Sequence, residues 1–188
     1  MYKTKLTYQL ILHAVALLFT FSSCKKISEE IQRDMGITPA ALSFTTPIIG
    51  NVITETTIGT VAANPDFDAL IKSQDMQFSK ADIQSIRVSE MKLEFTDPDK
   101  TNNLANFESL TVKIQADGLA TLNIAVRTET ANTESKSILL PLVNSAFDYR
   151  AYLTGTNLKY TVTALLRTAT TKTLATTLTP RYLITVAK

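Results

Sequence analysis

The stretch LTVKIQADGLATLNIAVR, at residues 110–127, decides the fold class of this chain. Apolar and polar residues alternate on both sides of its centre, which is the pattern of a β-strand with one buried face. The apolar positions are Leu110, Val112, Ile114, Leu122, Ile124 and Val126. Between the two runs, Asp117-Gly118 is a two-residue turn sequence that tolerates positive φ. The stretch therefore predicts an antiparallel β-hairpin.

The same alternation recurs in other parts of the chain. It is clearest at residues 158–166 and returns at residues 178–186, where Pro180 shares the apolar face. Because proline cannot donate a ladder hydrogen bond, we expect that last strand to be at an edge or bulged near Pro180. Further strands are predicted around Leu42 and Phe44 and at residues 52–61, 138–142 and 147–151.

Residues 86–95 carry an alternating pattern that changes parity. Ile86 and Val88 occupy even positions, whereas the apolar residues from Met91 onward occupy odd positions. A one-residue slip turns side chains to the other face of a sheet. The pattern therefore predicts either a bulge near Ser89-Glu90 or a switch between sheets.

Helical signals are few. Asn64 suits an N-cap and Pro65 suits the first helical position, before an apolar face made by Phe67, Leu70 and Ile71. A second short helical turn is predicted at residues 103–107. Eight or nine evenly spaced strands with one short helix predict an all-β fold, either an antiparallel β-sandwich or a jelly-roll-like domain.

The first 24 residues differ from the rest of the chain. Two lysines precede an apolar run at residues 10–21, and two serines and the single cysteine, Cys24, follow it. That order is the layout of a signal peptide. The run holds about twelve residues, and a membrane-spanning helix needs about 20. The segment therefore predicts a leader and not a membrane span.

The four residues Phe21-Ser22-Ser23-Cys24 resemble the lipobox of bacterial lipoproteins, in the looser form found in Bacteroidota. The resemblance covers residues 1–24, and it implies cleavage before Cys24 and acylation of that cysteine with fatty acids such as palmitate. It also implies a lipid-anchored place in the cell envelope. Lys25, where some lipoproteins have Asp, permits sorting to the outer membrane, with a periplasmic or a surface-facing display left open.

These features divide the chain into a signal peptide at residues 1–23, a lipidated tether at 24–40 and a β-sandwich domain at 41–188. Within the tether, Ile27, Ile31 and Met35 are four residues apart, which fits one face of a short helix. A linker without regular structure is the alternative.

Charge and composition exclude several classes of function. The chain has a formal charge of +2, and removing the two leader lysines leaves seventeen basic against seventeen acidic residues. A neutral domain lacks the basic footprint of a nucleic-acid-binding protein. The only histidine, His13, lies in the leader. A Ser-His-Asp triad or a Cys-His pair would therefore lack its imidazole. A zinc site made of His and Cys would lack its ligands, and we predict no cofactor.

One loop has the composition of a cation site. Asp97, Asp99 and Asn102 supply the carboxylate and amide oxygens that Ca²⁺ prefers, although their spacing is not that of an EF-hand. Asp, Pro and Asn are also ordinary turn residues, and a plain loop is the alternative.

Two further groups of side chains bear on glycans. Acid pairs can serve a glycosidase, and the candidates are Glu90, Glu94, Glu108 and Asp148. Three tyrosines can form a sugar-stacking platform, although tyrosines on half-buried strands commonly belong to the core; they are Tyr149, Tyr160 and Tyr182.

The sequence therefore supports a lipid-anchored, non-catalytic envelope β-domain with a binding or assembly role in which the partner is an envelope protein or a glycan. A subunit of a surface fibre or pilin-like assembly is one alternative, prompted by the terminal strand with Pro180. A carboxylate-dependent glycan-active enzyme is the other.

Overall fold

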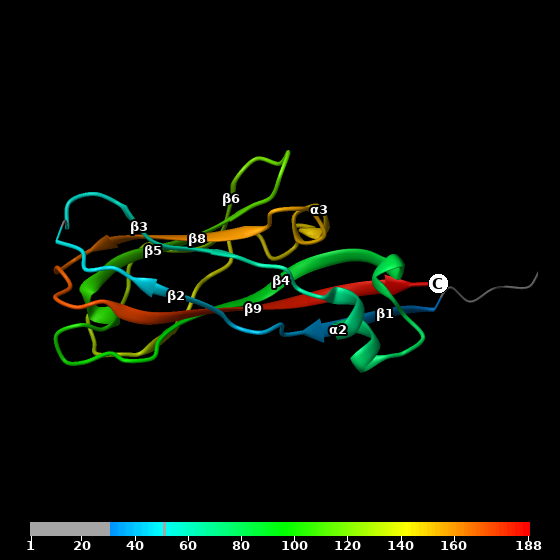
Figure 1. The fold of residues 1–188 in the computed structure, drawn as a ribbon, viewed down its shortest axis with the longest axis horizontal. Helices are drawn as coiled ribbons and strands as arrows, with labels where there is room; N and C mark the ends of the chain where they lie inside the picture. The colour runs from blue at the N-terminus through cyan, green and yellow to red at the C-terminus, as the bar shows by residue number, and fades with distance from the viewer. Residues whose placement is uncertain (1–30, 51) are drawn as a thin grey trace, which may run out of the picture. The chain divides into compact units, whose positions relative to one another are not determined.

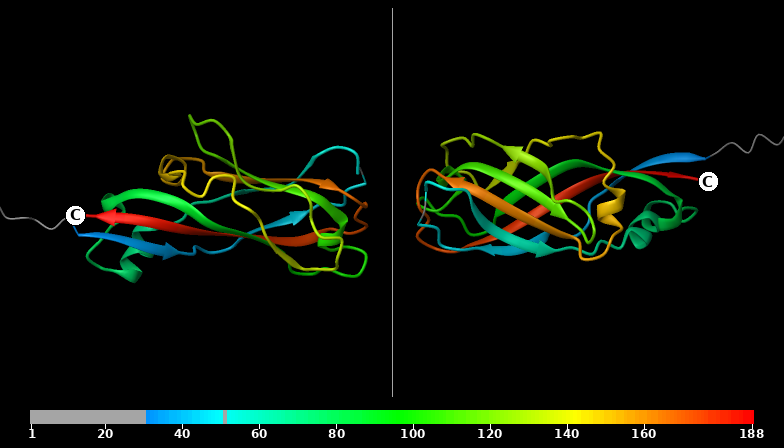
Figure 2. Two further views of the ribbon diagram at one scale, coloured as in Figure 1. Left: turned by 180° about the vertical axis from the view of Figure 1, so that it is seen from behind. Right: turned by 90° about the horizontal axis from the view of Figure 1, so that it is seen from above.

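Nine strands form two antiparallel sheets in the computed structural model, which describes residues 31–50 and 52–188. The first sheet has the order β1(Gln32–Ile37)-β9(Leu174–Ala187)-β4(Ile83–Phe95)-β7(Ser137–Leu139), and β2(Leu42–Thr46) also pairs with β9. The second sheet has the order β3(Thr56–Ala62)-β8(Lys159–Leu166)-β5(Phe107–Gln115)-β6(Leu122–Arg127). Figures 1 and 2 show the two sheets as layers. The predicted all-β, sandwich-like fold is confirmed.

One apolar core fills the space between the sheets. The alternating residues of β8 and β9 supply much of it, and the two tyrosines Tyr160 and Tyr182 are its largest fully buried side chains. The face predicted for residues 158–166 is buried at every expected position, namely Leu158, Tyr160, Val162, Ala164 and Leu166. Burial of this face drives the sheets together, since each fully buried aliphatic side chain contributes roughly 1.5–3 kcal/mol.

The predicted hairpin is confirmed as β5 paired with β6, with two corrections. The register shifts between Val112 and Lys113, so that Val112 lies opposite Ala125 while Lys113 lies opposite Asn123. The extra residue, Ile124, breaks the expected alternation, and Ala125 is buried where Val126 was expected.

The turn of this hairpin also differs from the expectation. Leu119 N donates to Ala116 O at 3.2 Å, and of the two central residues only Gly118 has a positive φ, of 71°. A two-residue hairpin turn of type I′ needs positive φ at both positions. Strand pairing begins only at Ile114 opposite Leu122, so the loop is longer than predicted.

The parity change in residues 86–95 is a β-bulge. All of this segment lies in β4, whose register against β9 shifts between Val88 and Glu90. The shift lets the apolar residues on both sides of Ser89 face the core, and these are Ile86, Val88, Met91, Leu93 and Phe95. The first of the two predicted explanations is therefore correct.

The strand that contains Pro180 is central in its sheet but locally lacks one neighbour. β1 pairs with residues 182–187 of β9 and β2 with residues 174–178, so residues 179–181 have no strand on that side. On the other side, Pro180 lies opposite Met91 of β4, beside the bulge. The predicted edge character is thus confined to a gap between β1 and β2. Outside this gap, β9 is paired on both sides, so the terminal strand gives no support to strand donation.

The main helix begins two residues later than predicted. α2 (Phe67–Gln74) has Asp66 as its N-cap, because the Asp66 carboxylate accepts a hydrogen bond from Ala69 N at 3.0 Å. Phe67 and Ile71 are buried, as the apolar face predicted. The predicted helical turn at residues 103–107 is present as a 3₁₀ turn, Leu104–Asn106.

The strand predicted at residues 147–151 is wrong, because a short helix, α3 (Arg150–Leu153), occupies its end. The Asp148 side chain accepts hydrogen bonds from Arg150 N and from Ile86 N, both at 2.9 Å. An aspartate that binds nearby backbone N–H groups favours a turn over an extended strand.

Three other predicted elements have different bounds. The strand at 138–142 is reduced to β7 and a bridge between Leu142 and Ala125, and the strand at 52–61 begins at Thr56. In the predicted tether, residues 32–37 form β1, whose Met35 and Ile37 are buried, so a helix does not form there. Residues 1–30, with the predicted leader and Cys24, lie outside the described residues.

Candidate functional site

The acidic loop, residues 97–102, ties two other segments together. Asp97 follows β4, and its carboxylate accepts a hydrogen bond from Ala175 N of β9 at 2.8 Å. The Asp97 carbonyl accepts one from Lys172 Nζ at 2.6 Å. Asp97 thus holds the start of β9 against the end of β4.

Asp99 turns back on its own loop. Its Oδ1 accepts hydrogen bonds from Thr101 N at 2.8 Å and Asn102 N at 2.7 Å, and its Oδ2 lies 3.1 Å from Lys172 Nζ. The Asn102 backbone bond and then the Lys172 side chain lower the pKa of Asp99 to about 2. The carboxylate is therefore occupied by the protein's own donors.

The predicted calcium ligands serve different partners. Asn102 Oδ1 accepts from Thr171 N at 2.7 Å, while Asp97 and Asp99 bind the groups described above. Among residues 31–50 and 52–188, no group of three or more His, Cys, Asp or Glu side chains could hold a metal ion. These bonds describe a loop clasp, and calcium binding stays a prediction without support from this geometry.

A shallow depression of about 350 Å³ lies beside the acidic loop. Its lining carries both signs of charge, from Asp99, Lys100, Glu134 and Lys136. Mixed charges of this kind give no net attraction for a cation or an anion.

Three buried asparagines continue the clasp, and we call Asn102, Asn103 and Asn106 the asparagine junction. Asn106 Oδ1 accepts from Asn103 N at 2.8 Å, and its Nδ2 donates to Thr101 O at 2.9 Å and Ala169 O at 3.2 Å. The junction joins the loop between β4 and β5 to the loop between β8 and β9. Each amide hydrogen of Asn106 has an acceptor, so the junction is a closed structural unit.

The acidic candidates for glycan hydrolysis do not form an evident pair. Glu90 and Glu94 are four residues apart on β4, which separates their Cα atoms by about 13 Å. Glycosidase carboxyl groups lie about 5–9.5 Å apart, and here a lysine, Lys92, stands between the two glutamates along the strand. Lys92 Nζ donates to Glu94 at 2.6 Å and lowers the pKa of that carboxyl group. Glu108 lies on β5 in the second sheet, and Asp148 binds two backbone N–H groups.

The three candidate sugar-stacking tyrosines are core residues. Tyr149, Tyr160 and Tyr182 are 2%, 0% and 1% exposed, so none offers a ring face to solvent. Tyr160 of β8 and Tyr182 of β9 join the two sheets, because their hydroxyl oxygens are hydrogen bonded at 2.7 Å. We call this pair the tyrosine junction. The sugar platform is therefore contradicted by the burial of all three rings.

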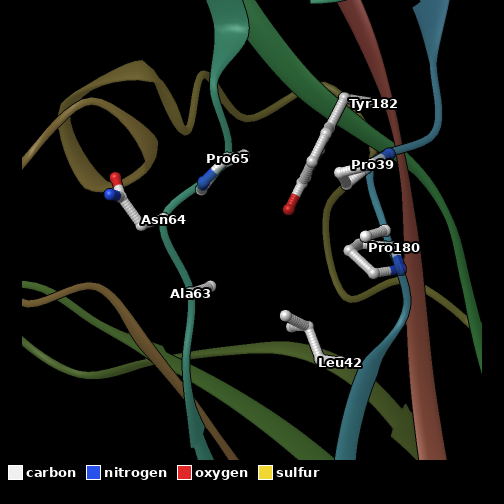
Figure 3. A pocket seen from close by; sticks show the side chains of 8 residues that line it. Pro39, Leu42, Ala63, Asn64, Pro65, Pro180 and Tyr182 are labelled. Atoms are coloured by element: carbon white, nitrogen blue, oxygen red, sulfur yellow. The ribbon is translucent and has the colours of Figure 1, made fainter.

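A cavity of about 110 Å³ adjoins the tyrosine junction. Its walls come from the connection between β1 and β2, from the connection between β3 and α2, and from β9. Most of the lining is apolar, from Pro39, Ala40, Leu42, Ala63, Pro65 and Pro180. Tyr182 and Asn64 complete the lining, and Figure 3 shows the Tyr182 hydroxyl directed into the space while the Asn64 amide points away.

Sequence reasoning identified the components of this cavity without bringing them together. Pro65 was expected to start a helix and Pro180 to mark a strand edge, and Tyr182 was expected on the apolar face. The gap between β1 and β2 brings Pro39 and Pro180 to one place, and that gap depends on strand pairing. The only signal in the sequence was the disruption that each proline causes in regular structure.

The described residues contain no helix that is long and apolar enough to cross a membrane.

Comparisons with known proteins give no family for the chain. No protein-family model and no curated protein matches it. Two solved structures, of infectious bursal disease virus Gt strain and Gx strain, are similar at a TM-score of 0.34 and 12% identity. The match covers 82% of this chain in both cases, and 33% and 32% of those chains.

Proposed function

We propose that the protein is a lipid-anchored, non-catalytic β-sandwich of the bacterial cell envelope, attached through Cys24, with a binding or assembly role. The observation that carries the proposal is Phe21-Ser22-Ser23-Cys24, placed directly after an apolar run of leader length. Acylation would make the attachment stable, since each buried methylene contributes about 0.8 kcal/mol and more than one chain is added.

The position of the folded domain is compatible with an anchor at Cys24. β1 begins at Gln32, eight residues after the cysteine. A chain spans at most about 3.5 Å per residue, so this separation allows at most about 28 Å between the two residues. The domain would therefore work close to the membrane surface.

The described side chains favour a binding or assembly role over catalysis. The acidic loop uses its carboxylates to hold backbone segments, and Glu94 is paired with lysine. The described domain also lacks histidine and cysteine. The described residues therefore offer no evident acid–base pair for the glycan-active alternative.

Fatty-acid labelling tests the anchor. We expect the full-length protein, expressed in a bacterium that processes lipoproteins, to incorporate a palmitate analogue and to remain in the membrane fraction. Cys24→Ala should lose the label and move to the soluble fraction. Ser23→Ala is the matched control, because it keeps a small residue before the cysteine and should behave as wild type. A Cys24→Ala protein that stays fully membrane-bound would contradict the proposal.

Crosslinking in intact cells tests the second half of the proposal. A binding or assembly role predicts a discrete crosslinked species of higher mass for the wild-type protein. Absence of any such species with the anchored wild-type protein would count against that role while leaving the anchor intact.

A further inference from the structure

The cavity beside the tyrosine junction is bounded by residues that do not pair with each other. β1 and β2 both leave β9 at residues 179–181, and Figure 3 shows Pro39 and Pro180 on the same wall of the cavity, with both rings projecting towards it. Neither proline has a backbone N–H, so the gap leaves no donor unpaired at those two positions. On the opposite wall, Ala63 presents only a methyl group to the cavity.

One hydroxyl hydrogen of the tyrosine junction has no acceptor among the residues that the structure describes. Two hydroxyl groups carry two hydrogens, and the bond between Tyr160 and Tyr182 uses one of them. Among the residues that the structure describes, neither hydroxyl has a second hydrogen-bond partner. A buried hydroxyl hydrogen without an acceptor is costly, and native proteins rarely leave one so.

The position of the two hydroxyls indicates where this hydrogen points. Tyr160 does not line the cavity, whereas Tyr182 does and directs its oxygen into it. When Tyr160 donates to Tyr182, the remaining hydrogen belongs to Tyr182 and faces the cavity. Burial raises the pKa of Tyr182 well above that of an exposed tyrosine, so the hydroxyl remains a donor at all physiological pH values.

The lining sets the chemistry of an occupant. It contains no charged side chain, so an ion placed there would lose its hydration without compensation. A sugar would bury several hydroxyl groups against proline, alanine and leucine side chains, which offer those hydroxyls no hydrogen-bond partner. Of the two lining side chains that carry polar atoms, Figure 3 shows only that of Tyr182 directing one into the space.

The size of the cavity sets the size of the occupant. Pockets for drug-sized ligands measure about 300–1,000 Å³, and an apolar cavity of about 150 Å³ holds benzene. At about 110 Å³ this cavity is smaller than the benzene site and partly open, so it admits at most one small ring, part of which would remain outside.

We propose that this cavity is a binding site for an uncharged, ring-sized apolar group that carries one acceptor oxygen, which takes the free hydrogen of Tyr182. A free cyclic ketone or ester has this chemistry, and so does a proline with the carbonyl that precedes it. The site is independent of the anchor at Cys24.

Methyl-detected NMR on the full-length chain in detergent micelles tests the site. The methyl groups of Leu42, Ala40 and Ala63 report on the cavity, and that of Leu139 on a distant edge. We expect cyclohexanone to shift the cavity methyls saturably, with a Kd of about 1 mM for a probe of this size, and to leave Leu139 unchanged. N-acetyl-prolinamide is the second probe, and tighter binding of one of the two identifies the source of the natural group.

Two tyrosine variants form a matched pair. Tyr182→Phe removes the donor in the cavity and should weaken cyclohexanone binding about fivefold to tenfold. Tyr160→Phe removes a hydroxyl from the same bond but not from the cavity, and binding should stay within about twofold. Ala63→Leu fills the space and should abolish binding.

The proposal is overturned if neither probe binds below about 50 mM, which lies far outside the expected range. It is also overturned if glucose shifts the same methyls as strongly, or if Tyr160→Phe weakens binding as much as Tyr182→Phe. Because these variants leave Cys24 unchanged, failure here does not bear on membrane anchoring.

Discussion

The asparagine junction and the tyrosine junction both bury polar side chains, yet their hydrogen bonds differ. In the first, Asn103 and Asn106 each place an amide between backbone donors and acceptors, and each of their amide hydrogens has an acceptor. In the second, two hydroxyls share one bond and one hydrogen remains. A complete network rigidifies a structure, whereas the hydrogen left over beside the cavity is the basis of the proposed binding site.

The surroundings of the two junctions reinforce the difference. The asparagine junction is enclosed by loops whose backbone groups supply its partners, such as Thr101 O and Ala169 O. The tyrosine junction adjoins a cavity walled by three prolines, which supply no backbone donors. We therefore assign stability to the first junction and recognition to the second.

The largest effect is expected from Asn106→Ala. The change leaves Asn103 N without its partner and Thr101 O and Ala169 O without donors, which should lower the free energy of unfolding by about 3 kcal/mol. Urea unfolding measures this loss. Asn132→Ala, at an exposed position, is the control and should stay within about 0.5 kcal/mol. A loss below about 1 kcal/mol at Asn106 would remove the claim that this junction is a structural unit.

A smaller effect is expected where β2 approaches β3, near the cavity. A Cβ atom on Gly59 would overlap the ring of Phe44, so Gly59→Ala should cost about 2 kcal/mol through displacement of that ring. Thermal or urea unfolding checks the value. Gly50→Ala is the matched control, because nothing lies within 4 Å of its added Cβ. Equal stability of the two variants would mean that the Phe44 ring is not packed closely against Gly59.

The smallest effect is expected from acid. The pKa of Asp99 is lowered from 3.8 to about 2 in the folded protein, so its carboxylate stabilises the fold fully above about pH 4, and this contribution is lost as the pH falls through about 2. The stability difference between wild type and Asp99→Asn should therefore be constant near neutral pH and shrink between about pH 4 and 2. Asn132→Ala, which changes no acidic group, is the control and should show no such change. A difference that grows with acid would show that the bonds to Thr101 and Asn102 do not favour the ionised form.

Patterns that depend on neighbouring residues were predictable from the sequence. Alternation gave the buried faces of β8 and β9, and the parity change between Val88 and Met91 gave the bulge in β4. Both follow from the two-residue period of a strand. The helical turn expected at residues 103–107 is also a local feature, and in the structure Asn103 caps it.

Features that depend on distant partners were not predictable in this way. The pairing of β1 with β9 turns residues 32–37 into a strand where local spacing favoured a helix or a linker. Asp148 accepts a hydrogen bond from Ile86 N, 62 residues earlier in the chain, at the point where a strand was predicted and the chain instead enters α3. The cavity needs both the gap between β1 and β2 and the bond between Tyr160 and Tyr182, which join residues far apart in the chain.

The most direct test of the contrast between the two junctions is NMR detection of the tyrosine hydroxyl hydrogens in the full-length protein with isotope-labelled tyrosine. We expect a slowly exchanging hydroxyl hydrogen for Tyr160, which would donate to Tyr182 within the core. We expect faster exchange for Tyr182, slowed when cyclohexanone is added. A slowly exchanging Tyr182 hydrogen and a rapidly exchanging Tyr160 hydrogen, both insensitive to cyclohexanone, would contradict this contrast.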